Sequence, residues 1–185
     1  MSIATKTGDD GTTALMYGSP RLQNATPESS ACGTVDELNA ALGFVRATVS
    51  APAITEAVLA IQKELVTLMG ELAVLPEDRE RYHKRQLQVC RSSHGRRPHH
   101  ASSTTWRKPS ASRFDGWATP GATLGSSALD LARTACRRAE RMVVALRETG
   151  AQVNPEILRY LNRLSDLLWL WARWVETQLT DPKTA

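Results

Sequence analysis

The stretch NPEILRYLNRLSDLLWLWARWV, residues 154–175, decides the fold. It opens with asparagine and proline, which is typical of a helix N-terminus because the polar side chain caps backbone N–H groups and proline suits the first helical position. Apolar residues then recur every three or four positions, which predicts a long helix with one buried face: Leu158, Leu161, Leu164, Leu168, Trp171 and Val175. We expect Trp169, Trp171 and Trp174 to lie in the core or in a subunit interface.

Three other segments have the same helical period. The first begins at Thr34, where Thr34-Val35-Asp36-Glu37 has the pattern of a capping box, and continues until Pro52. The second covers about 55–75, and the third about 124–147. No segment has a convincing strand pattern, and 185 residues suit one domain. The sequence therefore predicts an all-α, antiparallel helix bundle that forms a single domain over 1–185.

Composition excludes several classes of protein. No apolar run approaches the roughly 20 residues that span a bilayer, and the first residues do not resemble a secretory signal. The three cysteines have no metal-type spacing, which favours a reduced, cytoplasmic protein. No helix carries Glu-x-x-His and every histidine lies between 83 and 100, so a ferritin-like metal bundle is not expected.

The segment 84–113 breaks the helical pattern. Nine of the 23 basic residues, and none of the 19 acidic ones, lie between 81 and 113. Serines, histidines and prolines fill the segment, and a composition of this kind cannot cover one face of a bundle. One interpretation is a basic surface arm that binds nucleic acid, and another is a translation in the wrong reading frame.

The opening stretch Thr5-Lys6-Thr7-Gly8-Asp9-Asp10-Gly11-Thr12-Thr13 contains no apolar residue. Glycines let the backbone approach a phosphate, and consecutive N–H groups, hydroxyls and a lysine bind its oxygens. The stretch lacks the G-x-x-x-x-G-K-[ST] spacing of the common nucleotide loop, and an ordinary polar turn is the alternative interpretation.

Two helical segments carry polar groups beside their apolar faces. In 132–141, ARTACRRAER, the residues Arg133, Arg137 and Glu140 share one stripe, where the arginines need carboxylate or phosphate partners. In 160–166, YLNRLSD, Asn162 has low helix propensity, so we expect it to have a hydrogen-bonding role. Either set also fits ion pairs on a solvated surface or bonds between helices.

Four motifs together resemble the PduO-type corrinoid adenosyltransferases: the opening stretch 5–13, the helix start 33–39 (GTVDELN), the segment 132–141 and the segment 160–166. The resemblance covers about 1–82 and 114–176. It implies a five-helix bundle that forms homotrimers, with ATP between neighbouring subunits. It also implies transfer of the 5′-deoxyadenosyl group of ATP to cob(I)alamin, with release of triphosphate and with a flavin or other reductase supplying Co(I).

The resemblance also assigns roles to residues. The nucleotide is wrapped by the opening stretch, through Thr5, Lys6, Thr7, Gly8, Gly11, Thr12 and Thr13. Arg133 and Arg137 neutralise phosphate charge, while Glu140 and Asn162 bind the nucleotide or its Mg²⁺. Asp36 positions Arg133 across the subunit interface. Trp117, where phenylalanine is usual, helps to displace the lower axial base of the corrinoid.

The chain departs from the family pattern at two places. A lysine and an arginine of the family fall on Asn24 and Glu28, which removes positive charge near the phosphates. The family's middle helix falls within 84–112, where two compensating frameshifts would explain the unusual composition. The alternatives are an inactive binding or regulatory protein of the same family, and a basic helical protein that binds nucleic acid; we expect neither nucleic acid nor a membrane as a partner.

Overall fold

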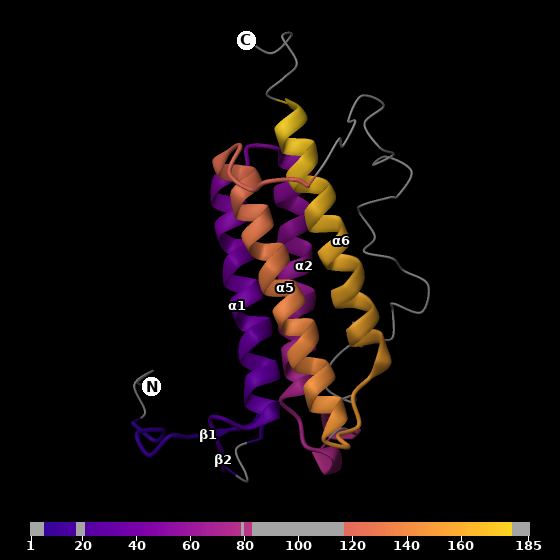
Figure 1. Cartoon of the computed structure of the whole chain (residues 1–185). Helices are drawn as coiled ribbons and strands as arrows, with labels where there is room; N and C mark the ends of the chain where they lie inside the picture. The colour runs from indigo at the N-terminus through magenta and orange to yellow at the C-terminus, as the bar shows by residue number, and fades with distance from the viewer. Residues whose placement is uncertain (1–5, 18–20, 79, 83–116, 179–185) are drawn as a thin grey trace.

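The computed structural model describes residues 6–17, 21–78, 80–82 and 117–178. Within these ranges the chain is mainly helical, and a small hairpin precedes the helices (Figure 1). The elements are β1 (Thr12–Ala14), β2 (Arg21–Gln23), α1 (Pro27–Thr48), α2 (Pro52–Leu72), the short 3₁₀ helix η1 (Pro76–Asp78), α5 (Leu124–Glu148) and α6 (Pro155–Gln178).

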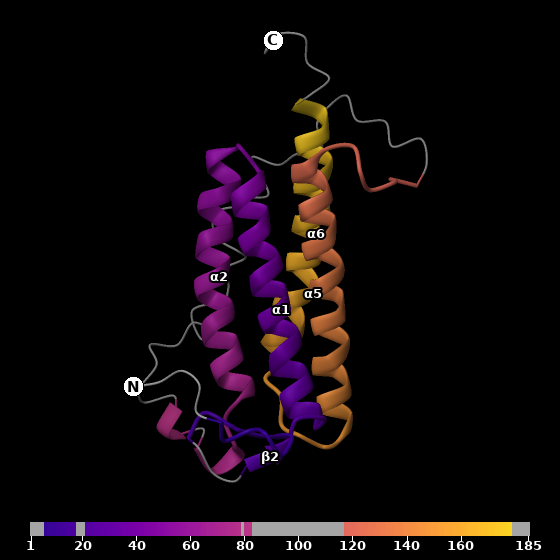
Figure 2. The ribbon, with the colours of Figure 1, turned by 90° about the vertical axis from the view of Figure 1, so that its left-hand side faces the viewer.

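The long helices lie side by side as a bundle, which confirms the predicted fold class (Figures 1 and 2). α1 packs against α2 and α5, and α5 packs against α6. α1 and α6 run in one direction, and α2 and α5 run in the other. Tyr82 and Trp117 therefore lie at opposite ends of the bundle. The middle helix expected within 84–112 lies outside the described residues.

The start of α1 differs from the sequence-based expectation. The helix begins at Pro27, where the Thr26 side chain accepts a hydrogen bond from the Ser29 backbone N–H at 3.4 Å. Thr34, the predicted cap, lies inside the helix, and its hydroxyl donates to the Ser30 and Ala31 carbonyls. The prediction was wrong because a threonine followed three residues later by glutamate also occurs within a helix, where the backbone N–H groups are already bonded.

The other helix starts follow their expected signals more closely. α5 begins after a capping box in which the Thr123 and Ser126 side chains each accept from the other's backbone N–H. The Asn154 side chain accepts from the Glu156 backbone N–H at 3.0 Å at the start of α6, as its asparagine and proline predicted. α2 begins and ends three residues earlier than the sequence predicted.

The expectation of no strand was also wrong. β1 and β2 form an antiparallel pair in which Thr12 lies opposite Gln23 and Ala14 opposite Arg21. Strands of three residues are too short to show an alternating pattern, so periodicity did not reveal them.

The core is made from the apolar stripes that the sequence predicted. Trp171 is 1% exposed, and the core cluster to which it belongs takes side chains from each long helix described. Typical members are Val35, Leu38, Val58, Leu65, Leu129, Ala139, Leu161 and Leu168. Among the described residues, no helix is both long and apolar enough to cross a bilayer.

Candidate active site

The seam between α5 and α6 carries four of the predicted site residues. Arg133, Arg137 and Glu140 occupy successive turns of α5, and Asn162 reaches Glu140 from α6. The Asn162 side-chain amide donates to Glu140 Oε1 at 3.0 Å, and Arg163 in turn donates to Asn162. Arg137 is exposed and has no ion-pair partner among the described residues. The seam therefore offers a free guanidinium beside an oriented carboxylate.

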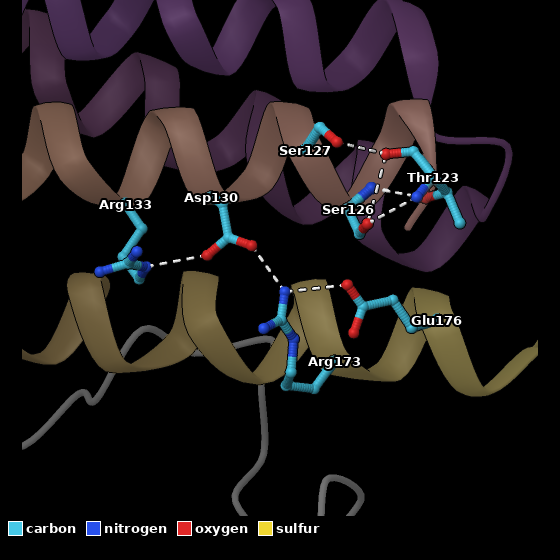
Figure 3. A network of polar contacts seen from close by, with 7 residues as sticks. All are labelled: Thr123, Ser126, Ser127, Asp130, Arg133, Arg173 and Glu176. Carbon is cyan, nitrogen blue, oxygen red and sulfur yellow. Dashed lines mark hydrogen bonds and ion pairs between the residues drawn. The ribbon is translucent and has the colours of Figure 1, made fainter. Parts of the chain in front are cut away.

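Arg133 is held within its own helix. Its Nε donates to Asp130 Oδ1 at 3.0 Å, and its side chain is 25% exposed. The other oxygen of Asp130 accepts from Arg173 of α6, which also donates to Glu176 at 2.9 Å (Figure 3). Sequence reasoning missed Asp130 and Arg173. The available signal was a charged residue inside an otherwise apolar stripe, and such a residue is buried only when it is paired.

Asp36 does not meet Arg133 within the protomer. It is exposed on α1, and it has no ion-pair partner among the described residues. Its neighbour Glu37 instead forms an ion pair with Arg138 of α5. A single protomer therefore leaves Asp36 unused.

The opening stretch forms a compact polar turn. Lys6 and Gly11 have positive φ angles of 56° and 79°, and Gly11 N donates to Gly8 O at 2.9 Å. The Asp10 carboxylate accepts from both the backbone N–H and the hydroxyl of Thr12. The residues 6–11 of the turn are exposed, and Thr5 lies outside the described residues.

The turn and the arginines of α5 do not meet within one protomer. The turn lies at the end of the bundle where α1 begins and α5 ends (Figures 1 and 2). Arg137 lies about three helical turns, or roughly 16 Å, before the end of α5. Trp117 lies in the loop that precedes α5, at the other end of the bundle, and is 95% exposed.

Cys136 lies behind the polar seam and is fully buried. Its thiol donates to the Leu161 carbonyl at 3.2 Å. Burial, with a smaller contribution from the Glu140 carboxylate, raises the pKa of this thiol from 9.0 to about 12, although Arg137 opposes the shift. The thiol therefore stays neutral and does not serve as a nucleophile.

No group of three or more histidine, cysteine or acidic side chains comes together among the described residues in a way that could hold a metal ion by itself. Glu140 nevertheless fits the kind of site in which Mg²⁺ takes one carboxylate from the protein and its other ligands from phosphates and water. Asn162 fixes one of its oxygens and leaves the other available.

Comparison with known proteins identifies the family. The family model described as cobalamin adenosyltransferase matches residues 3–175. The corrinoid adenosyltransferase of Bacillus subtilis (strain 168) is 35% identical over 182 residues, which cover 96% of this chain and 88% of the relative. A corrinoid adenosyltransferase of Citrobacter freundii is 35% identical over 179 residues, which cover 95% of each.

A solved structure supports the same family assignment. It is a phenylalanine-to-alanine variant of a PduO-type ATP:corrinoid adenosyltransferase from Lactobacillus reuteri, complexed with cobalamin and ATP. Its TM-score to this chain is 0.78 at 28% identity, and the alignment covers 98% of this chain and 97% of that one.

The chain belongs to the cobalamin adenosyltransferase family. By that membership it is a transferase, of the corrinoid adenosyltransferase class. The resemblance predicted from the four motifs is confirmed, and so is the activity that it implied, adenosyl transfer from ATP to cobalamin.

Proposed function

We propose that this chain transfers the 5′-deoxyadenosyl group of ATP to cob(I)alamin at a site shared by two protomers of a homotrimer. The row formed by Arg133, Arg137, Glu140 and Asn162 carries the proposal, because it gathers phosphate-binding chemistry on one seam. The opening turn supplies the remaining contacts to the nucleotide. Since the turn lies at the far end of its own bundle, a neighbouring protomer provides it.

The chemistry needs no nucleophile from the protein. Cob(I)alamin attacks C5′ of ATP, so that a Co–C bond forms, the C5′–O bond breaks, and the electron pair leaves with triphosphate. The protein must orient C5′ and stabilise the negative charge that develops on the leaving group. Arg137 and Arg133 supply positive charge for this task, and the neutral thiol of Cys136 takes no part.

Glu140 and Asn162 are the residues that would hold Mg²⁺, which would neutralise part of the charge of the triphosphate. Trp117 would contact the corrinoid. Its side chain is almost fully exposed in a loop, which leaves it accessible to the corrinoid or to another protomer. Asp36 would position Arg133 of the neighbouring protomer.

The outer face of α1 and α5 suits self-association. Glu37 pairs with Arg138 between these antiparallel helices. Phe44 and Leu131 each lie two helical turns farther along, so they stand at the same level. They are 45% and 56% exposed, and together they offer an apolar patch on this face. We infer that this face contacts another copy of the chain.

The remaining proposals concern the cellular setting. The chain forms one domain over 1–185 and acts in the cytoplasm, where a flavin or other reductase supplies cob(I)alamin. Among the described residues, Cys32 and Cys136 are free thiols, which agrees with that compartment.

A spectroscopic assay tests the function. Cobalamin is reduced chemically to the Co(I) state, ATP and Mg²⁺ are added, and the absorption spectrum is followed. We expect conversion to adenosylcobalamin with one triphosphate released per turnover. Binding of ATP without conversion would instead support an inactive binding protein, and DNA binding with a steep salt dependence would support a nucleic-acid-binding protein.

A further inference from the structure

Asp130 is a buried carboxylate that the four family-like motifs do not include. It is 4% exposed and lies one turn before Arg133 on α5, where the neighbouring positions Ala128, Leu129 and Ala132 are also buried. Both of its oxygens are used, one by Arg133 and the other by Arg173 (Figure 3). A buried carboxylate with two arginine partners is fixed in place, because breaking either ion pair would leave a buried charge without its partner, which costs free energy.

The contact with Arg133 has a particular geometry. Asp130 accepts from Nε, which is the inner nitrogen of the guanidinium, at 3.0 Å. The two terminal nitrogens of Arg133 have no hydrogen-bond partner among the described residues. Asp130 therefore restricts the orientation of the Arg133 guanidinium plane, and the two terminal nitrogens of Arg133 stay available as donors. This arrangement suits bidentate binding of a phosphate or a carboxylate.

Arg173 closes the arrangement from α6. Its side chain is 5% exposed, and it donates to both Asp130 and Glu176. Its Nε is buried without a hydrogen-bond partner among the described residues, and its guanidinium lies 5.9 Å from the Trp169 ring. The group is therefore confined by packing and by two carboxylates, and Arg173 fixes the position of Asp130.

We propose that Asp130 is a positioning residue for Arg133, and that buried Arg173 holds Asp130 in the required place. The proposal rests on the proposed function, in which Arg133 meets the triphosphate of ATP. Asp130 touches no substrate, so its whole effect on the reaction passes through Arg133.

A double-mutant cycle tests this dependence. The wild-type enzyme, Asp130→Asn, Arg133→Gln and the double variant are compared by their inhibition constants for inorganic tripolyphosphate, measured against ATP. We expect Asp130→Asn to raise this constant about tenfold, the size of one well-oriented charged contact, and to leave the KM for cobalamin unchanged. In the Arg133→Gln background the same change should have no further effect, because residues that act through one contact are not additive.

Glu156→Gln is the matched control. It removes another carboxylate that pairs with an arginine three residues later, Arg159, on the exposed side of α6. We expect its inhibition constant and its kcat to match the wild type.

A merely structural role for Asp130 would reduce the amount of folded enzyme, and so kcat, but would leave the inhibition constant unchanged. That result would overturn the proposal, as would an equal effect of Asp130→Asn in both backgrounds. If circular dichroism shows that Asp130→Asn does not fold, Arg173→Lys replaces it in the cycle, since it keeps the cation. A smaller rise that vanishes in the Arg133→Gln background supports the proposal, and an unchanged constant overturns it.

The wild-type enzyme separates the two proposals. If it forms adenosylcobalamin and the cycle is additive, only the positioning role fails. If it neither forms adenosylcobalamin nor binds tripolyphosphate, the proposed function fails as well.

Discussion

At the scale of single residues, Arg137 differs from five arginines of the long helices that form ion pairs. Arg133, Arg138, Arg159, Arg163 and Arg173 each pair with a carboxylate of the same chain. Arg137 is exposed and has no such partner among the described residues. Its charge therefore contributes little to the stability of the protomer and is available to a ligand.

Replacing Arg137 by alanine should accordingly separate activity from stability. We expect Arg137→Ala to lower kcat by about 10²–10³, the usual loss when one donor to a developing negative charge is removed. The free energy of unfolding should change by less than about 0.5 kcal/mol, because the side chain is exposed. Turnover assays and urea unfolding measure the two effects. Arg159→Ala, on the exposed side of α6, should keep its activity; full activity of Arg137→Ala would refute the role.

Cys136 predicts a loss of stability at alkaline pH. Its pKa is raised from 9.0 to about 12 in the folded protein, so above pH 9 the unfolded chain releases a proton that the folded chain retains. The contribution of this thiol to the free energy of unfolding is fully present below pH 9, and it falls by about 1.4 kcal/mol for each pH unit above pH 9. Between pH 8 and 11, the free energy of unfolding measured with urea should therefore fall more steeply with pH for the wild type than for Cys136→Ala. Parallel curves would show that the thiol ionises equally in both states.

At the scale of elements, periodicity identified each long helix that the structure describes, because an apolar stripe must face the core whatever its neighbours are. It misplaced the start of α1, since the true cap, Thr26, precedes the stripe by several residues. It brought Arg133, Arg137 and Glu140 together because they share one helix. It missed the partnership of Asp130 with Arg173, because pairing between helices depends on how they pack and not on spacing within either sequence.

The contact between α2 and Tyr82 gives a prediction about packing. A Cβ atom on Gly70 would lie 2.5 Å from the Tyr82 hydroxyl and 3.0 Å from its ring. This hydroxyl donates to the Thr67 carbonyl at 2.7 Å, and Tyr82 is 3% exposed. Alanine favours a helix by about 1 kcal/mol over glycine, but displacing a buried ring costs about 1–3 kcal/mol.

Gly70→Ala should therefore lower the free energy of unfolding by about 1 kcal/mol. Gly43→Ala is the matched control, because its Cβ would meet only Gln62 Nε2 at an ordinary 3.7 Å. It should raise stability by about 0.5–1 kcal/mol through helix propensity alone. Urea unfolding of both variants measures the difference, and two stabilised proteins would mean that Tyr82 moves aside freely.

At the scale of the whole molecule, one protomer holds the parts of the site at separate places. The opening turn lies at one end of the bundle, Trp117 lies at the other, and the arginine seam lies between them (Figures 1 and 2). Asp36 is exposed on a different helix from the arginine that it is proposed to position. These separations follow from straight helices of more than 20 residues, which keep their side chains apart along the axis. Assembly of several copies brings such parts together without any bending of the bundle.

Complementation between two inactive variants tests this arrangement directly. One variant carries Arg137→Ala, and the other carries Thr7→Ala and Gly8→Val in the opening turn. We assume that each site takes its turn from one protomer and its arginine from the next. In randomly mixed trimers about half of the sites then have an intact arginine, and about half of those also have an intact turn, so about a quarter of all sites are complete. Co-expressed variants should then regain about a quarter of the wild-type activity, while each variant alone stays inactive. Light scattering after size exclusion establishes the trimer; mixed trimers without regained activity would place the complete site within one protomer.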